Sequence, residues 1–484
     1  MTILPHDTHS LCAACLAVVP ASVVERDGAV WMLKTCPRHG AAEILLSPDA
    51  QWYRQTVAQG PHLQAPAPPV RPVAQGCPLD CGPCAQHEMG LQLPIVPITA
   101  ACNLDCPICY THNHNAGGWH LSEAALDAIL VHLRRLEPNQ RIINLTGGEP
   151  TEHPDFMALV QRCADAGIHR ITLSTHGLRF LQESALLPLL AALDARVVLS
   201  FDSLRDDANR AMLGGALTHA KLRILDLLDQ HKVSTTLLPV VAKGHNDDEL
   251  GQFVRLVLDR PYLRSLELHT MTFTGQSGTA FDRQARLTTL DVLRLVQVQT
   301  QGLLRVSDFV PAPAAHALCY QVAYLLRLGD GQWLPFTRFM APANVRAMLA
   351  GTLYLEPGPQ VDAQLHEAIS RLYAGDVDLP EAPLVLASLK AMLGAFFAAQ
   401  GDPLAQMRAG EDWTKAVYVH AHMDAENFDT DRIRQCCVSI VEPDGQTVPS
   451  CAYNVLYRNR DVRFVAKPLA AVATLGIGRI RGLA

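Results

Sequence analysis

From about residue 93 to residue 300, the chain alternates short apolar runs with amphipathic stretches. The apolar runs that we expect to form strands are Leu93–Ala101, Arg141–Leu145, Arg170–Ser174, Arg196–Phe201, Ser234–Val241 and Leu263–Thr270. Between them we expect helices, one with Ser122 as its N-cap and one from Pro154, in its first turn, to about Ala166. Six such repeats predict an α/β fold whose parallel sheet winds into a partial (β/α)6 barrel. Chemistry in such folds lies on the loops after the carboxyl ends of the strands.

The remainder of the 484-residue chain divides where this pattern changes. Residues 1–58 form a short module with three cysteines, and the proline-rich residues 59–92 form a linker with a further cysteine loop. The predicted barrel covers residues 93–300, and residues 301–484 follow a mixed pattern. The elements expected in that last part are helices at about 363–374 and 384–399 and hairpins at 326–336 and 438–450. We expect a C-terminal α+β domain packed over the barrel.

Composition restricts the partners and the location. The net charge of −7 argues against nucleic acid or an anionic membrane surface as the main partner. No charge-free apolar stretch reaches the roughly 18 residues that a membrane span needs, and the mean hydropathy of +0.10 is compatible with peripheral membrane contact. The opening segment MTILPHDTHS lacks the form of a signal peptide. We therefore expect a cytoplasmic protein with reduced thiols.

The 14 cysteines of a reduced protein favour metal sites over disulfides. Twelve of them fall into four sets of three: Cys12, Cys15 and Cys36; Cys77, Cys81 and Cys84; Cys102, Cys106 and Cys109; Cys436, Cys437 and Cys451. Cys163 lies four residues after Leu159 on an apolar helix face and is expected in the core. Cys319 either completes a metal site or packs in the core.

The most specific motif is Cys102-Asn-Leu-Asp-Cys106-Pro-Ile-Cys109-Tyr110, directly after the first predicted barrel strand. Three thiolates at this spacing suit three corners of a cubane [4Fe–4S] cluster and leave one iron open. A structural zinc knuckle is the alternative, but it explains neither the missing fourth ligand nor the position at a strand end. His112 and His114 follow the loop and either line the site or are solvated.

Three further strand ends carry polar residues or glycines. The candidates are Gly147, Gly148, Glu149 and Pro150 after the second strand, Ser174 and Thr175 at the third, and Ser200 and Asp202 at the fourth. Paired glycines at a strand end allow a ligand to approach the backbone closely. A tight turn and ordinary polar strand ends are the alternatives.

The C-x3-C-x2-C-aromatic loop and the GGEP segment resemble the motifs of radical S-adenosylmethionine (SAM) enzymes. The resemblance implies that the open iron binds the amino and carboxylate groups of SAM, and that Tyr110 lies against adenine. It further implies that Gly147–Pro150 contact the SAM amino group, and that Ser174, Thr175, Ser200 and Asp202 contact its ribose or carboxylate. Such an enzyme cleaves SAM reductively to a 5′-deoxyadenosyl radical, using a donor such as flavodoxin or ferredoxin.

The other cysteine sets predict additional metal sites. Cys77, Cys81 and Cys84 repeat the cluster spacing, and a turn centred on Asp444-Gly445 brings Cys437 and Cys451 to neighbouring positions. We expect an auxiliary [4Fe–4S] cluster at each of these two sets, with zinc or bare thiols as the alternative. At the N-terminus, Cys12, Cys15, Cys36 and, as a fourth ligand, His39 are typical of a rubredoxin or zinc ribbon, which holds iron or zinc.

The order of these modules resembles the branch of archaeal tetraether lipid synthases and their bacterial relatives. It implies hydrogen abstraction from an unactivated carbon and carbon–carbon bond formation on a lipid or other long-chain substrate. Members of that branch carry a further cysteine near the position of Ala314, which this chain lacks. The alternatives are methyl transfer to a pterin-like small molecule, modification of a peptide, and electron transfer without catalysis.

Overall fold

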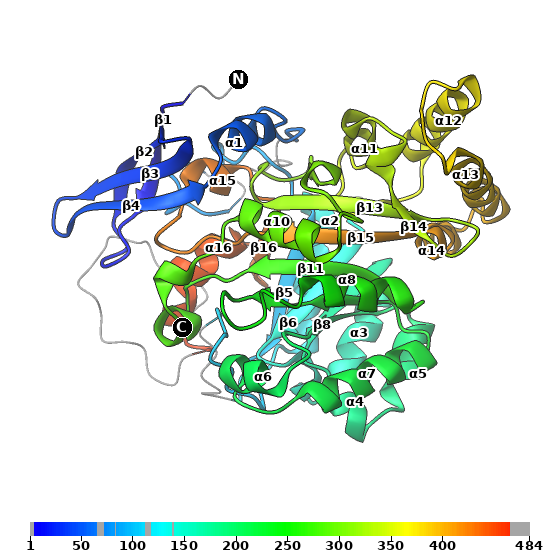
Figure 1. The fold of residues 1–484 in the computed structure, drawn as a ribbon. Helices are drawn as coiled ribbons and strands as arrows, with labels where there is room; N and C mark the ends of the chain where they lie inside the picture. Colours follow the sequence, from blue (N-terminus) through cyan, green and yellow to red (C-terminus); the bar gives the residue numbers. More distant parts are fainter. Residues whose placement is uncertain (1–3, 65–71, 83, 112–117, 138–139, 465–484) are drawn as a thin grey trace.

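The computed structural model describes residues 4–64, 72–82, 84–111, 118–137 and 140–464. The N-terminal module is an antiparallel sheet with a helix beside it: β1 (His6–Leu11), β2 (Val18–Arg26), β3 (Ala29–Cys36), β4 (Gly40–Ser47) and α1 (Ala50–Val57). This small sheet lies at one side of the main body (Figure 1). Its β1–β2 and β3–β4 loops bring the first cysteine set together.

All six predicted strand regions form strands in the structure. The elements of this part are β5 (Leu93–Thr99), α2 (Glu123–Leu136), β6 (Ile142–Gly147), α3 (Phe156–Asp165), β7 (Arg170–Thr175), α4 (Arg179–Gln182), α5 (Leu186–Ala192), β8 (Arg196–Ser200), α6 (Asp206–Leu213), α7 (Thr218–Gln230), β9 (Thr235–Leu238), β10 (Val240–Val241), α8 (Leu250–Asp259), β11 (Leu263–Thr270), α9 (Ser277–Ala280) and α10 (Thr289–Gln299). Ser122 caps α2 as predicted, since its side chain accepts from the Ala125 N–H. Two boundaries differ from the prediction. Asp155 is the N-cap of α3, so Pro154 precedes that helix, and the fifth strand region divides at Pro239, whose nitrogen cannot donate to a ladder.

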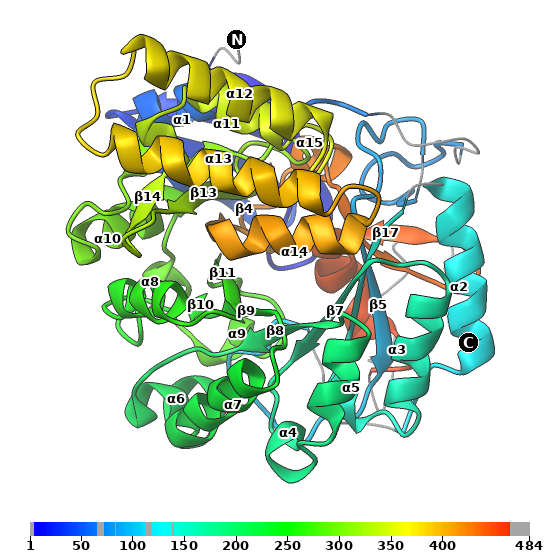
Figure 2. The same ribbon diagram turned by 90° about the vertical axis from the view of Figure 1, so that its right-hand side faces the viewer.

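Strands β5, β6, β7, β8, β9 and β11 pair in parallel and in that order. Helices α2, α3, α5, α7 and α8 pack on one face of this sheet, where they bury an apolar core with outward residues such as Leu145 and Leu173 (Figure 2). Because side chains alternate along a strand, the next residues, such as Asn144 and Ser174, belong to the opposite face. That inner face is the one that carries polar groups.

The C-terminal part joins this same sheet, which corrects the expectation of a domain packed over it. Its elements are β12 (Val310–Pro311), β13 (Tyr320–Arg327), β14 (Trp333–Pro335), α11 (Pro342–Met348), α12 (Pro359–Ala374), α13 (Ala382–Ala398), α14 (Pro403–Trp413), β15 (Thr414–His420), α15 (Thr430–Arg434), β16 (Val438–Val441), β17 (Thr447–Pro449) and α16 (Ser450–Ala452). β15 pairs in parallel with β11 at one end, and β16 pairs in parallel with β5 at the other. The strands of this part and those of the predicted barrel thus form one 13-stranded sheet.

The two predicted C-terminal helices and both hairpins are present, but one register differs. Helices α12, α13 and α14 stack together beside β13 and β14 (Figure 2). In the last hairpin Ser439 pairs with Pro449, and the Glu442 N–H donates to Gln446 O. The loop therefore has three residues centred on Asp444, with left-handed Gly445 (φ 84°) as its third residue. This shift by one places position 451 level with 437.

Residues from both ends of the strand order line a single cavity. Tyr320 on β13 and Val438 on β16 both belong to its wall, so the sheet curves around it. Among the described helices, none has both the length and the apolar character required to cross a bilayer.

Candidate active site and metal centres

The cavity has a volume of about 270 Å³ and lies at the carboxyl ends of the parallel strands. It brings together nearly all of the residues that the motifs single out as candidates for SAM binding. These lining residues are Cys102, Cys106, Cys109, Tyr110, Gly147, Gly148, Glu149, Ser174, Thr175, Ser200 and Asp202. Pro150 is buried but does not line the cavity, since it starts the 3-10 turn Pro150–Glu152 behind it. His112 and His114 lie outside the described residues.

Neighbouring loops hold the cysteine loop in place. The Ile108 N–H donates to Met212 O (3.0 Å), and the Gln276 N–H donates to Cys109 O (2.9 Å). Burial raises the pKa of Cys102 to about 12 and also raises the pKa of Cys106. Thiols in this environment lose their protons when a metal binds them. Three cavity-facing thiols without a fourth cysteine in the loop fit a [4Fe–4S] cluster with one open iron.

Glu149 links the second strand end to the third. Its Oε1 accepts from Thr151 N (3.1 Å), Thr151 Oγ1 (2.7 Å) and Thr175 Oγ1 (2.5 Å), and its Oε2 accepts from His176 N (2.8 Å). Four donors match the roughly four lone-pair sites of a carboxylate. The side chain, 1% exposed, therefore holds the loop in place. Gly147 and Gly148 line the cavity beside it, with the Gly148 N–H donated to Thr99 O (2.8 Å).

Hydrogen bonds fix each of the remaining strand-end residues, Ser174, Ser200 and Asp202. Ser174 exchanges hydrogen bonds of 3.1 Å with Asn144, and Asp202 accepts from the Val240 N–H (2.9 Å). Burial raises the pKa of Asp202. Lys221 is buried behind them and donates to Ser200 O (2.6 Å), which fixes that strand end. The hydroxyl of Thr175 donates to Glu149. Of Ser174 and Thr175, the two residues predicted at this strand end, Ser174 is therefore the one that can bind a ligand in the cavity.

The N-terminal site has the geometry of a single tetrahedral metal ion. Ligand atoms of Cys12, Cys15, Cys36 and His39 all lie within 4.8 Å of one another. The sulfur atoms of Cys15 and Cys36 are 3.9 Å apart, and His39 Nδ1 is 3.5 Å from Cys12 Sγ. Two thiolates bound at 2.3 Å to one tetrahedral ion would be about 3.8 Å apart. Backbone N–H groups and His39 lower the pKa of Cys36 to about 6, which favours the ligating thiolate.

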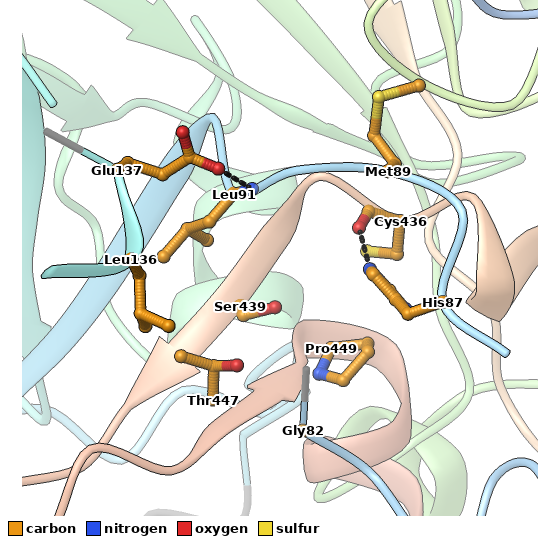
Figure 3. A pocket seen from close by; sticks show the side chains of 10 residues that line it. All are labelled: Gly82, His87, Met89, Leu91, Leu136, Glu137, Cys436, Ser439, Thr447 and Pro449. Atoms are coloured by element: carbon orange, nitrogen blue, oxygen red, sulfur yellow. Dashed lines mark hydrogen bonds between the residues drawn. The ribbon is translucent and has the colours of Figure 1, made fainter. Parts of the chain in front are cut away.

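The cysteine loop before the barrel contacts the C-terminal part of the chain. Gly82 and Cys436 line the same small pocket, in which His87 Nε2 lies 2.8 Å from Cys436 O (Figure 3). Burial raises the pKa of Cys81, and the thiols of Cys77, Cys84 and Cys436 raise it further. Cys436 therefore lies between this set and the C-terminal set.

Cys319 belongs with the C-terminal cysteines. Burial raises the pKa of Cys451 to about 11, and the nearby Cys319 raises it as well. Cys319 likewise raises the pKa values of Cys436 and Cys437. Two of these sulfurs accept hydrogen bonds. Arg432 Nη2 donates to Cys319 Sγ (3.3 Å), and the Met423 N–H donates to Cys451 Sγ (3.3 Å). Cys163 is fully buried in the apolar core, as predicted.

The motif analysis missed two features of the cavity. One is a group of polar residues on β11, on β15 and just after β15: Glu267, His269, His420 and His422. The other is Arg458, which is 2% exposed and whose Nε and Nη2 have no hydrogen-bond partner in the described chain. No local pattern marks either feature, because the pairing of β15 with β11 assembles the first and the C-terminal turn after α16 places the second.

Comparisons with known proteins agree with this geometry. The Radical SAM superfamily matches residues 96–257, and the HMPTM N-terminal zinc ribbon domain matches residues 4–48. The 7,8-dihydro-6-hydroxymethylpterin dimethyltransferase of Methanocaldococcus jannaschii is 26% identical over 486 residues, covering 93% of this chain and 94% of that protein. The GTP 3′,8-cyclase of Moorella thermoacetica is 34% identical over 142 residues, or 29% of this chain and 43% of that protein. The solved structure of Streptococcus suis SuiB bound to its precursor peptide SuiA has a TM-score of 0.38 and 16% identity, covering 44% of this chain and 46% of that chain.

The superfamily match, the three-thiol loop and the cavity define this chain as a radical SAM enzyme. Its cofactors are a [4Fe–4S] cluster and SAM, and its N-terminal module is a zinc ribbon. The relative that matches along nearly the whole chain is a pterin methyltransferase. The comparisons thus support the methyl-transfer alternative over the lipid-coupling function that the sequence motifs favoured.

Proposed function

We propose that this radical SAM enzyme transfers methyl groups from SAM to a pterin-like heterocycle. For each methyl group, one SAM would give the radical that removes a hydrogen, and a second SAM would give the methyl group and leave as S-adenosylhomocysteine, with one electron from the external donor for each SAM. The observation that carries the proposal is the match to the M. jannaschii pterin dimethyltransferase, which extends over 93% of the chain and includes the zinc ribbon region. A relative that matches along nearly the whole chain is a better guide to substrate class than one that matches less than a third of it.

The character of the cavity supports a small polar substrate. Its wall carries Glu267 together with three buried histidines, of which His422 has its ring centroid 5.3 Å from that of Tyr110. Burying an alkyl chain against a carboxylate would leave polar groups without partners, at a cost of about 1–3 kcal/mol for each. A heterocycle with ring N–H and carbonyl groups can satisfy them instead. A lipid coupling enzyme requires an apolar wall at this place.

In this proposal the parallel strands β5–β11 act as the partial barrel, and Cys102, Cys106 and Cys109 hold the SAM-binding cluster. When bound, this cluster supplies the electron that cleaves SAM. Tyr110 covers the adenine, and Ser174, Ser200 and Asp202 hold the ribose and carboxylate. Cys77, Cys81 and Cys84 hold one auxiliary cluster. Cys319, Cys437 and Cys451 hold the other, and Cys436 is available to either. An external electron donor such as flavodoxin or ferredoxin completes the system.

We further propose that Arg458 binds the carboxylate of SAM, which is the anionic group of that molecule. The guanidinium lines the cavity and interacts electrostatically with Cys109 and Tyr110. Burial lowers its pKa, as expected for a charge without a hydrogen-bonded counter-ion. An anion in the cavity supplies the missing acceptor.

Replacing Arg458 with methionine is expected to raise the KM for SAM by about 10- to 100-fold, because a hydrogen bond to a charged group contributes about 1.5–3 kcal/mol. The variant should unfold at about the same temperature as the wild type, since it loses the contact of the guanidinium with the Phe464 ring (3.7 Å) but also removes a buried charge whose Nε and Nη2 have no hydrogen-bond partner in the described chain. Initial rates of 5′-deoxyadenosine formation over a range of SAM concentrations measure the effect. Arg294→Met, on an exposed ion pair with Asp49, is the control. An unchanged KM in the Arg458 variant contradicts the assignment.

The function is tested with anaerobically reconstituted protein, dithionite and SAM labelled with 13C in its methyl group. One arm contains 7,8-dihydro-6-hydroxymethylpterin and the other contains long-chain lipids. We expect mass spectrometry to find one or two labelled methyl groups on the pterin, each in place of a hydrogen. A coupled lipid without label, in the absence of pterin methylation, would overturn the proposal in favour of carbon–carbon bond formation.

A further inference from the structure

Three histidines form a compact buried cluster in the wall of the SAM cavity. His269 lies near the end of β11, His420 ends β15, and His422 follows two residues later. One ring nitrogen of each lies within 4.8 Å of one from each of the others. All three residues are buried and line the cavity. None of the three histidines has a role in the proposed binding or cleavage of SAM.

Each imidazole has one nitrogen engaged by an acceptor outside the cluster. Glu267 Oε1 lies 2.9 Å from His269 Nε2 and 3.2 Å from His420 Nδ1. His422 Nδ1 lies 3.6 Å from the sulfur of Cys451. The nitrogens left over are Nδ1 of His269 and Nε2 of the other two rings. With the hydrogens assigned to the engaged nitrogens, these are the atoms that keep lone pairs for a ligand.

The rings are also held in orientation. Tyr320 stacks on His420 with ring centroids 3.7 Å apart and an interplanar angle of 21°. Burial lowers the pKa of His420 to about 4 and lowers that of His422 well below its usual value, so both rings are neutral near pH 7. Although burial raises the pKa of Glu267, the hydrogen bonds from the two histidines hold it well below its usual range. The cluster is thus three imidazoles backed by a carboxylate.

We propose that His269, His420 and His422 bind one divalent transition-metal ion, for which Zn²⁺ is the probe. Three imidazoles are a standard ligand set for such ions in sites that keep one position open. Metal-bound histidines nearly always donate their second N–H to a carboxylate or another acceptor, which is the arrangement that Glu267 and Cys451 provide here. The open position faces the cavity, where water or an oxygen or nitrogen donor of the substrate completes the coordination.

The charge around the cluster is compatible with a dication. Glu267 contributes a negative charge directly behind two of the rings. Arg432 is the nearby positive group, and its Nη2 donates to Cys319 Sγ (3.3 Å) and to Ala421 O (2.7 Å). Its charge also acts on the cluster, because it adds to burial in lowering the pKa values of His420 and His422, and the carboxylate of Glu267 opposes this effect at His420. A metal at the histidines lies between the auxiliary cysteines and Tyr110, whose ring centroid is 5.3 Å from that of His422.

The test uses tag-free holoprotein with reconstituted clusters, equilibrated with Zn²⁺ and then freed of unbound metal. We expect the wild type to retain one more Zn²⁺ per chain than the His420→Ala/His422→Ala double variant, by elemental analysis, at equal cluster iron. His366→Ala, on the exposed face of α12, should retain the wild-type content. The zinc ribbon contributes equally to all three proteins, so its occupancy cancels.

A second variant keeps the three ligands and changes only the group behind them. Glu267→Gln should weaken Zn²⁺ binding by about 10- to 100-fold, measured by competition with a chelator. This result does not depend on whether the double variant folds. Equal zinc in the wild type and the double variant, or an unchanged affinity in Glu267→Gln, would show that the histidines form a hydrogen-bonded network without metal. Because the readout is metal content, it is independent of which substrate the enzyme uses.

Discussion

Replacing Cys106 with alanine is expected to reduce formation of 5′-deoxyadenosine by more than about a thousandfold, to the background of the protein-free reaction. In the proposed assignment the loop supplies three cluster ligands, and all three cysteines line the cavity. With two thiolates left, the cluster that delivers the low-potential electron is lost, and no side chain of the protein can replace redox chemistry of that kind. Iron content and the electron paramagnetic resonance signal of the reduced protein should fall by the share of this one cluster.

The control for this variant is Cys163→Ala. Cys163 has the same side chain but lies fully buried in the apolar core at α3, with no metal-ligating neighbour in its cluster of contacts. Its truncation removes a small apolar group and costs stability without touching the cavity. Iron content and SAM cleavage should stay at wild-type levels. If Cys106→Ala cleaved SAM as fast as this control, the assignment of the loop to the SAM-binding cluster would be wrong.

Replacing Gly147 with alanine is expected to destabilise the protein by more than about 3 kcal/mol and to abolish SAM binding. Gly147 has a φ of 148°, a conformation that residues with a Cβ rarely adopt. A Cβ there would lie 2.2 Å from Thr99 O. That carbonyl has little freedom to move, because it accepts the Gly148 N–H at 2.8 Å. The substitution must separate β6 from β5 at the point where both strands reach the cavity.

Gly329→Ala is the matched control, because a Cβ at that position meets no atom within 4 Å. Its stability should stay within about 0.5 kcal/mol of the wild type, as for most surface substitutions. Denaturant unfolding of both variants and equilibrium dialysis with SAM give the comparison. A Gly147→Ala protein with wild-type stability and SAM affinity would show that the β5–β6 junction is looser than the contact at Thr99 implies.

Local sequence patterns were sufficient for the features that depend on neighbouring residues. The strands β5–β11 were predicted because each is a short apolar run between amphipathic helices. The cysteine loop and the Gly147–Pro150 segment were found because all the atoms that define them lie within a few residues. The same holds for the zinc ribbon, whose two knuckles need only antiparallel strands to meet.

The register of the last hairpin and the separate C-terminal domain were predicted wrongly. The first depended on the conformation of a single residue, and the second on pairing between strands that lie far apart in the sequence. The register of the last hairpin depended on whether its loop has two or three residues, a difference that Gly445 decides through one left-handed conformation. The C-terminal part was expected as a separate domain because a sequence does not state which sheet edge a strand will join. β15 and β16 are apolar strands like any others, and only their pairing with β11 and β5 makes them part of the cavity.

The amino-acid sequence by itself determined the chemistry of this protein: the cluster ligands, the parallel strands that present them, and the zinc ribbon. These depend on spacing along the chain, which a sequence contains directly. The tertiary structure alone decided what else surrounds the bound cofactors. It placed His420 and His422 beside His269 and Glu267, Cys319 beside Cys451, and Arg458 in the cavity wall. Those residues are up to about 190 positions apart, and the free energy that joins them comes from strand pairing and apolar burial elsewhere in the sheet.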